Sequence, residues 1–231
     1  MVNNKTRIDL KMEAKEFINK YPNIKFIFIP LIILTLIQAF TQDTNTTNIV
    51  SNEMQTFNLS VSYNTVNMLV SWILVFVQAC LSFKVLDYLR NPKEYENLTG
   101  TELLMGTFND LGKYALNIFL VSLVSGIFII LGYVAFIVPG IILGLGYSQI
   151  FYILKDKTDN GNYSGIMDTL SESFRLMNGH KGDFFVLSLS FIGWYIVVGI
   201  TFGIAGIWVY PYIYITQTLF YENLLAEKGL N

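Results

Sequence analysis

Charged residues are scarce in this chain of 231 residues, making up 14% of it, whereas an ordinary soluble domain has about 25%. Hydrophobic residues make up 53%, and the mean hydropathy is +0.48. A soluble domain of this length could not bury so much apolar surface in one core. Acids and bases nearly cancel, with a formal net charge of −2, so the composition does not indicate a polyanionic partner such as nucleic acid.

Cysteine and histidine occur once each, as Cys80 and His180. One cysteine cannot close an internal disulfide or build a zinc site, and its place in an apolar run is typical of an inert packing residue. The sequence has no Ser-His-Asp set, nucleotide-binding loop, pair of catalytic carboxylates or cluster of metal ligands. We therefore expect a protein that is not an enzyme and that holds no cofactor and no metal.

The apolar residues form four runs, at residues 26–40, 66–83, 114–154 and 184–221. A helix needs about 20 residues to cross roughly 30 Å of hydrocarbon. The first two runs are therefore one span each, and each of the last two is long enough for a hairpin of two spans.

Turn residues divide the two long runs. Pro139 suits the first turn of a second helix, where its missing N–H is not needed. Gly199, Gly203 and Gly206 indicate the other break, and Pro211 then lies inside the last span as a predicted kink.

The predicted fold is all-α: a single membrane domain over residues 1–231, with six transmembrane helices arranged as three hairpins. The predicted spans are residues 24–40, 65–84, 114–134, 138–154, 184–202 and 205–221. No Asp, Glu, Lys, Arg or His lies in the apolar core of any of these spans. This argues against a proton-coupled transporter, because such proteins keep ionisable groups within the membrane.

The basic residues predict the orientation of the spans. With six spans, all fifteen Lys and Arg residues fall on one side of the membrane, and basic residues are concentrated in cytoplasmic loops. We therefore expect both termini in the cytoplasm, with residues 1–23 as an amphipathic N-terminus and residues 85–113 and 155–183 as cytoplasmic loops. Residues 41–64, which contain no Lys or Arg, are then an extracellular loop.

A short amphipathic helix is predicted ahead of each hairpin, at residues 8–18, 102–111 and 166–177. In the third, the apolar side chains recur at helical spacing along one face. An aromatic residue, a polar turn and a basic residue follow in each case; the aromatic residues are Phe17, Phe108 and Phe174. We interpret this pattern as three tandem units, each an interfacial helix followed by a hairpin.

Several motifs of the C-terminal half are similar to those of a known family. They are the turn at residues 138–141 (VPGI), residues 187–194 (LSLSFIGW), residues 203–208 (GIAGIW), Pro211-Tyr212 and residues 220–222 (FYE). With these motifs the chain resembles the bacterial integral-membrane family described as domain of unknown function 975. The resemblance implies a six-span protein of the cell membrane, mainly in Gram-positive bacteria, and implies no activity or catalytic residues.

Four polar or aromatic residues of the fourth and sixth spans could face each other: Tyr147, Gln149, Tyr214 and Gln217. One interpretation is a polar pocket in the cytoplasmic half of the membrane. The other, which we favour, is interfacial aromatics together with hydrogen bonds between helices, each worth about 0.6 kcal/mol in a membrane.

A second candidate lies in the polar turn before the fifth span. His180 and Lys181, flanked by glycines, could contact a lipid headgroup or a phosphate, because glycine lets backbone N–H groups approach an anion. The alternative, which we favour, is a helix cap and turn whose basic residues anchor the span at the interface.

Three functions remain open from the sequence. We favour a non-enzymatic protein of the bacterial envelope that acts through membrane lipids or other membrane proteins. The second is a transporter of a small molecule or lipid, or the permease part of one, because broken helices often form substrate sites. The third, an enzyme, would depend on His180 and Asp183.

Overall fold

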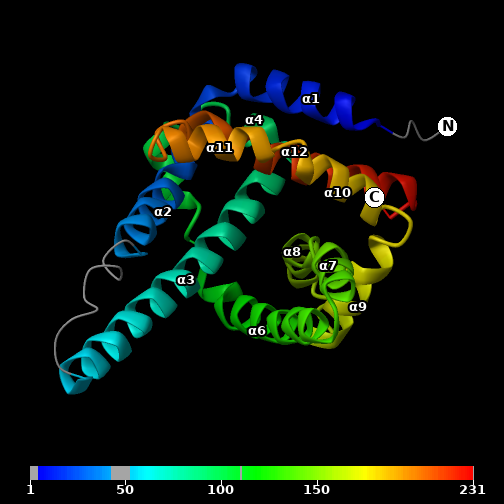
Figure 1. The fold of residues 1–231 in the computed structure, drawn as a ribbon. Coiled ribbons are helices and arrows are strands. Elements are labelled where there is room, and N and C mark those ends of the chain that lie inside the picture. The colour runs from blue at the N-terminus through cyan, green and yellow to red at the C-terminus, as the bar shows by residue number, and fades with distance from the viewer. Residues whose placement is uncertain (1–4, 43–52, 110, 231) are drawn as a thin grey trace.

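The computed structural model describes residues 5–42, 53–109 and 111–230. Every regular element in these residues is a helix (Figure 1), so the predicted all-α class is confirmed. The elements are α1 (Arg7–Lys20), the 3-10 helix η1 (Pro22–Phe28), α2 (Ile29–Gln42), α3 (Glu53–Arg90), α4 (Pro92–Tyr95), α5 (Gly100–Gly106), α6 (Leu111–Ala135), α7 (Ile137–Gly146), α8 (Ile150–Asp159), α9 (Ile166–Leu176), α10 (Lys181–Leu189), α11 (Ile192–Ile200) and α12 (Gly206–Glu227).

Four helical stretches of the described residues are long and apolar enough to cross a membrane: Asn67–Arg90, Leu111–Ala135, Ile137–Asp159 and Lys181–Ile200. A fifth is counted only if Arg7–Lys20 and Pro22–Gln38, which meet at 98°, form one bent span. Helices also occupy the first and the last of the six predicted spans, but these two do not reach the same length and apolarity. The structure therefore supports four or five candidate spans.

The last predicted span, residues 205–221, differs from the others because most of it is buried among other helices. It corresponds to α12, which packs against α1, η1, α2, α3 and α11. Twelve of its residues are buried, including Thr216 and Thr218. A helix that faces protein on most sides does not need the apolar surface that lipid requires, which explains its content of Tyr, Thr and Gln.

Part of the segment predicted as an extracellular loop, residues 41–64, is helical. α2 continues to Gln42 and α3 begins at Glu53, so residues 53–64 are helical, and residues 43–52 lie outside the described part. Residues 53–64 contain neither Pro nor Gly. Once a helix has formed, each added residue gains a backbone hydrogen bond, so α3 extends beyond the predicted span.

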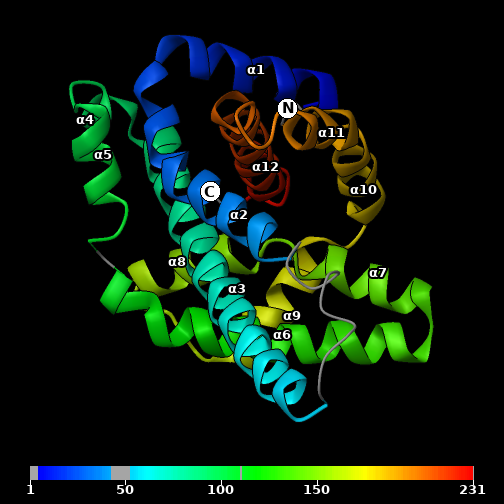
Figure 2. The same cartoon turned by 60° about the vertical axis from the view of Figure 1, so that its left-hand side comes forward.

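α6 and α7 form a hairpin whose helices lie side by side (Figures 1 and 2). The turn is at Phe136, within the predicted break, and Pro139 lies in the first turn of α7, as expected. A Cβ added at Gly132 would lie 3.0 Å from the Cα of Gly140, so the absence of side chains allows the two backbones to approach closely.

The turn between α11 and α12 lies where the glycines predicted it. Gly203 has a φ of +86°, a backbone conformation that is readily accessible only to glycine. Pro211 lies inside α12. Two further breaks were not predicted: Tyr147, Ser148 and Gln149 separate α7 from α8, and Ser190 and Phe191 separate α10 from α11.

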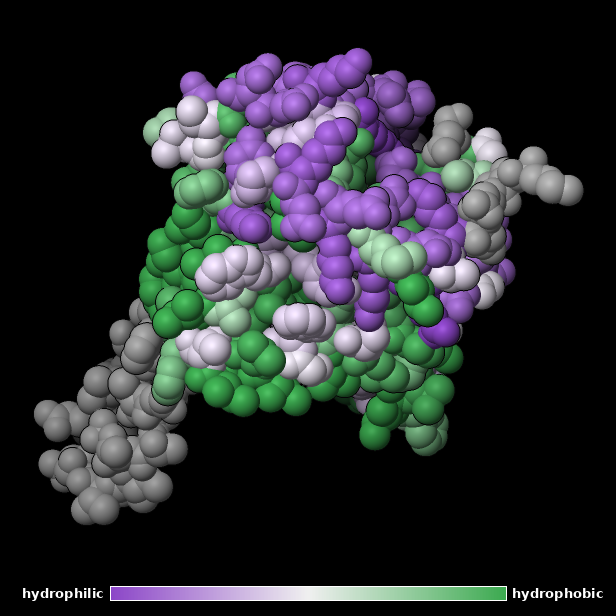
Figure 3. Space-filling model, turned by 90° about the horizontal axis from the view of Figure 1, so that it is seen from above, coloured by the Kyte–Doolittle hydropathy of each residue, from purple (hydrophilic) through white to green (hydrophobic). Residues whose placement is uncertain are grey.

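The surface is divided into a hydrophilic and a hydrophobic side. Hydrophilic residues gather along the upper part of Figure 3, and hydrophobic residues cover the lower part. In the most apolar stretches of α6 and of α10–α11, only 22% of the residues are buried, although the mean hydropathies are 2.5 and 1.9. So large an exposed apolar surface is typical of a protein embedded in a membrane.

Candidate functional site

A polar cavity of about 170 Å³ lies between α3, α8, α10 and α12. Its lining combines amides, hydroxyls and aromatic rings. The lining residues are Gln78, Ser82, Ser148, Gln149, Phe151, Tyr152, Phe184, Tyr214 and Gln217. No lining residue carries a formal charge near neutral pH. The cavity can therefore donate and accept hydrogen bonds but offers no strong acid or base.

The break between α7 and α8 places Gln149 in this cavity. The α-helical hydrogen bonds of α7 end at Tyr147, whose N–H donates to the carbonyl oxygen of Leu143, and α8 starts with Gln149 as its N-cap. In an uninterrupted helix each residue turns about 100° from the one before it. The break interrupts that rotation and positions Ser148 and Gln149 together at the cavity.

Gln149 is fully buried, and its side-chain oxygen has no partner. The hydroxyl of Ser148 donates to the carbonyl oxygen of Leu145 at 2.8 Å. That hydroxyl therefore accepts from the Gln149 amide nitrogen at 2.9 Å, which identifies the amide oxygen as the unpaired atom. Leaving a buried acceptor unpaired costs about 1–3 kcal/mol.

The other polar groups of the lining are partly satisfied. The Tyr152 and Thr218 hydroxyls are hydrogen-bonded at 3.1 Å, and Ser82 donates to the carbonyl oxygen of Gln78. Within the described part of the chain, the side chains of Gln78, Tyr214 and Gln217 have no hydrogen-bond partner. Three amides and one phenol thus keep hydrogen-bonding capacity at the cavity.

The structure brings together three of the four residues predicted for a polar pocket: Gln149, Tyr214 and Gln217. Tyr147 lies outside the lining and packs against Phe174, with ring centroids 6.1 Å apart. Two residues of α3, Gln78 and Ser82, also line the cavity and were not predicted. Gln78 could have been identified as a polar residue inside an apolar run. That these residues bind a ligand stays a prediction.

Charged side chains join the ends of several helices beyond the cavity. We call this group the charged end: Asp87 and Arg90 of α3, Lys113 of α6, Lys155, Asp156 and Asp159 of α8, and Glu222 of α12. Lys155 contacts Asp87 at 2.9 Å and Asp159 at 2.6 Å. Its ammonium group is largely buried, so the two carboxylates supply the compensation that burial of a charge requires.

α9 is joined to α8 by a second group of ions. Lys157 pairs with Asp168 and, at 2.5 Å, with Glu172. The ammonium group of Lys157 and the hydroxyl of Ser164 donate to Asp168 and hold the pKa of its carboxyl below the usual value. These contacts fix α9 against the end of α8.

His180 and Lys181, predicted as a headgroup contact, both have partners within the protein. His180 is the N-cap of α10, and its Nε2 lies 3.5 Å from a carboxylate oxygen of Glu227. The ammonium group of Lys181 lies 3.9 Å from the centroid of the Phe174 ring. These contacts hold the turn to α9 and α12, and headgroup binding stays a prediction.

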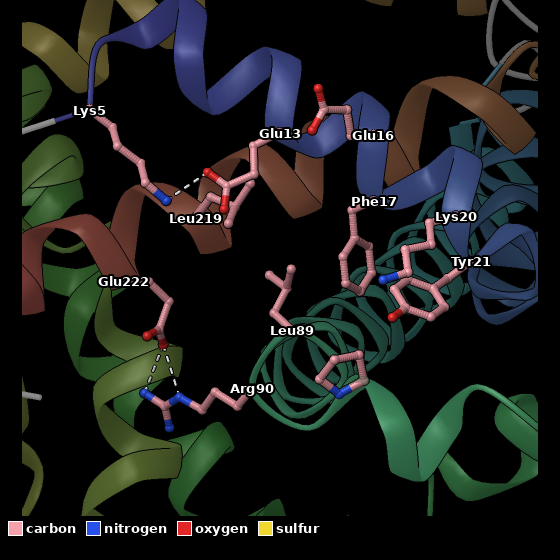
Figure 4. Close-up of a pocket in the computed structure, with 11 residues that line it drawn as sticks. Lys5, Glu13, Glu16, Phe17, Lys20, Tyr21, Leu89, Arg90, Leu219 and Glu222 are labelled. Carbon is pink, nitrogen blue, oxygen red and sulfur yellow. Dashed lines mark hydrogen bonds and ion pairs between the residues drawn. The ribbon is translucent and has the colours of Figure 1, made fainter. Parts of the chain in front are cut away.

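A wider cleft of about 460 Å³ lies between α1 and the ends of α3 and α12. Figure 4 shows its ion pairs: Lys5 with Glu13 at 2.7 Å, and Arg90 with Glu222 at 2.9 Å. Lys20 and Glu16 also line the cleft, so its lining contains three basic and three acidic side chains. A balanced cleft of this kind has no strong preference for ligands of either charge.

Comparison of the chain with known protein families gives one match. The family described as "Protein of unknown function (DUF975)" matches residues 116–228 of the chain. The resemblance inferred from the motifs is thereby confirmed over this region, which includes the α6–α7 turn and α12. No curated protein and no solved structure matches the chain.

Proposed function

Residues 116–228 match the family described as "Protein of unknown function (DUF975)", and from this premise we propose a non-enzymatic protein of the bacterial cell membrane that acts through lipid or protein partners. It has six spans arranged as three hairpins, with both termini in the cytoplasm. The charged end lies at the cytoplasmic surface, because all fifteen Lys and Arg residues fall on one side of the six-span arrangement.

The observation that carries this proposal concerns the three short helices ahead of the predicted hairpins, α1, α5 and α9. Each leaves a large apolar side chain exposed: Ile8 by 69%, Met105 by 73% and Met167 by 59%. Apolar side chains exposed beside ionic groups are typical of helices that lie in the plane of a membrane interface.

All three helices adjoin ionic groups of the hydrophilic side. The ammonium group of Lys5, before α1, pairs with Glu13 of α1 at 2.7 Å. The end of α5 approaches Lys84, which lies 3.5 Å from a Cβ added at Gly106, and α9 is paired to Lys157. We infer that the exposed apolar side chains insert among the headgroups of the inner leaflet, where nearby bases attract anionic lipid by about 1 kcal/mol each.

The proposal is tested by the depth of spin labels in lipid nanodiscs. Ile8, Met105 and Met167 are replaced one at a time by a labelled cysteine in a Cys80→Ala background. The nitroxides should be accessible to oxygen and poorly accessible to a water-soluble nickel chelate. Asn178, exposed in the polar turn, and Ile130, exposed on α6, are the aqueous and hydrocarbon references. If the three labels match that at Asn178, the helices lie in water and the proposal fails.

A second candidate function, a transporter of a small molecule or lipid, is favoured by one specific observation. The break between α7 and α8 lies at the polar cavity, and interrupted helices commonly form substrate sites in transporters. Proteoliposomes should then release a trapped neutral solute faster than protein-free liposomes. If liposomes with and without the protein release a range of small polar solutes at equal rates, the transporter function is contradicted and the first proposal is favoured.

A further inference from the structure

The polar cavity has the chemistry of a binding site. The oxygen of Gln149 is buried and has no hydrogen-bond partner among the groups of the protein. Such an atom is stabilised when a ligand or an ordered water donates a hydrogen bond to it. The free amides of Gln78 and Gln217 and the hydroxyl of Tyr214 offer further hydrogen bonds in the same lining.

The lining also restricts the charge and size of an occupant. Because no lining residue is charged, an ion would lose its hydration without gaining a counter-ion. A volume of about 170 Å³ exceeds the roughly 30 Å³ of one water molecule several-fold. The aromatic rings of Phe151 and Phe184 supply apolar walls beside the amides. Amides and hydroxyls beside aromatic rings suit a group that carries several hydroxyls on a small carbon frame.

The cavity is open to entry from outside the protein. Gln78 is exposed, and Phe151, Tyr214 and Gln217 are each partly exposed. Beyond the cavity, Tyr152 stacks on Tyr221 with ring centroids 5.0 Å apart. The Tyr221 hydroxyl in turn donates to Asp156 of the charged end at 2.7 Å. The binding groups are therefore held in place by the same contacts that join α8 to α12.

We propose that the cavity binds a small neutral polyhydroxylated group, with the Gln149 oxygen accepting a hydrogen bond from one of its hydroxyls. Gln217 and Tyr214 contribute further hydrogen bonds from α12, and Gln78 does so from α3. Two sources present this chemistry: a free polyol or sugar, and the sugar or glycerol end of a membrane lipid.

Saturation-transfer NMR on detergent-solubilised protein tests the free source, with glycerol and glucose as probes. Native mass spectrometry tests the lipid source, with monoglucosyl diacylglycerol compared with diacylglycerol, which lacks the sugar. Saturable binding in either experiment is the expected result, and the experiment that gives it identifies the source. If neither glycerol, glucose nor the glucosyl lipid binds, the cavity holds only water and the proposal is overturned.

Variants connect the binding to the cavity. Gln149→Leu should weaken binding about tenfold, as expected for the loss of one buried hydrogen-bond acceptor, and Gln217→Leu should weaken it several-fold. Gln38→Leu on α2 is the matched control, since Gln38 does not line the cavity, and should bind like the unmodified protein. Unchanged binding by Gln149→Leu overturns the proposal.

A folding check accompanies the binding data. Without ligand, Gln149→Leu should melt at the same temperature as the unmodified protein or above it, because the substitution removes an unpaired buried acceptor. The spin-label depths of the three short helices involve other residues, so the failure of one proposal is distinguishable from the failure of the other.

Discussion

Arg90, at the end of α3, binds Asp156 on α8 and Glu222 on α12 at the same time. Its guanidinium group donates to the two carboxylate oxygens of Asp156 at 2.6 and 2.9 Å, and its Nε donates to Glu222 at 2.9 Å. One side chain thus joins three helices that are far apart in the sequence. The rigid fork of arginine suits such a contact better than the single ammonium group of lysine does.

Replacing Arg90 with Gln should destabilise the protein. Two partly buried carboxylates, Asp156 and Glu222, would lose their common partner, and hydrogen bonds to charged groups contribute about 1.5–3 kcal/mol each before solvent screening reduces them. We expect a lower melting temperature in detergent. Arg90→Lys should recover only part of the loss. An Arg90→Gln variant that melts like the unmodified protein would show that this contact does not hold the three helices together.

Labelling should place the charged end inside the cell. In a Cys80→Ala background, single cysteines at Lys113, Arg175 and Lys228 should resist a membrane-impermeant thiol reagent in intact cells and react after lysis. This follows from the cost of moving basic side chains across hydrocarbon. Reaction of the Lys113 or Arg175 position in intact cells would contradict the proposed orientation and the six-span arrangement with it.

Two glycines of α7 offer a matched test of the α6–α7 hairpin. A Cβ at Gly140 would lie 2.5 Å from the ring of Tyr133, whereas one at Gly144 meets nothing within 4 Å. Gly140→Ala should therefore destabilise the protein by about 1–3 kcal/mol, the usual cost of overpacking. Gly144→Ala, with the same change of residue, should be neutral or slightly stabilising. Equal melting temperatures for the two variants would be inconsistent with close packing at Gly140.

The capping box of α5 predicts a pH effect. The backbone N–H and the hydroxyl of Thr99 donate to Glu102 and hold the pKa of its carboxyl below the usual value. A lowered folded-state pKa contributes stability above the unfolded value of about 4.3, and this contribution is lost as the pH falls through the folded pKa. Thr99→Ala should raise the Glu102 pKa in an NMR titration and speed amide exchange in α5. An unchanged pKa would mean that the cap does not form in solution.

The candidate site was partly predictable because polar residues stand out in apolar runs. Gln149, Tyr214 and Gln217 could be identified from the sequence alone for that reason. The sequence could not exclude Tyr147 from the pocket, because no proline marks the break between α7 and α8 that turns this residue away. Gln78 lines the cavity only because α3 packs against α8 and α12. The spacing of residues within a single apolar run does not predict which helices pack together.

The helical class and the apolar runs follow from the sequence alone, because they depend only on local composition and spacing. The sequence also determined the turns at Phe136 and Gly203, where proline and glycine restrict or free the backbone. Three features emerge only from the packing of the helices: α12 is buried, Arg90 joins three helices, and the Gln149 oxygen is left unpaired. The physical reason is that burial and hydrogen-bond pairing depend on which helices become neighbours, and contacts between distant segments set those neighbours.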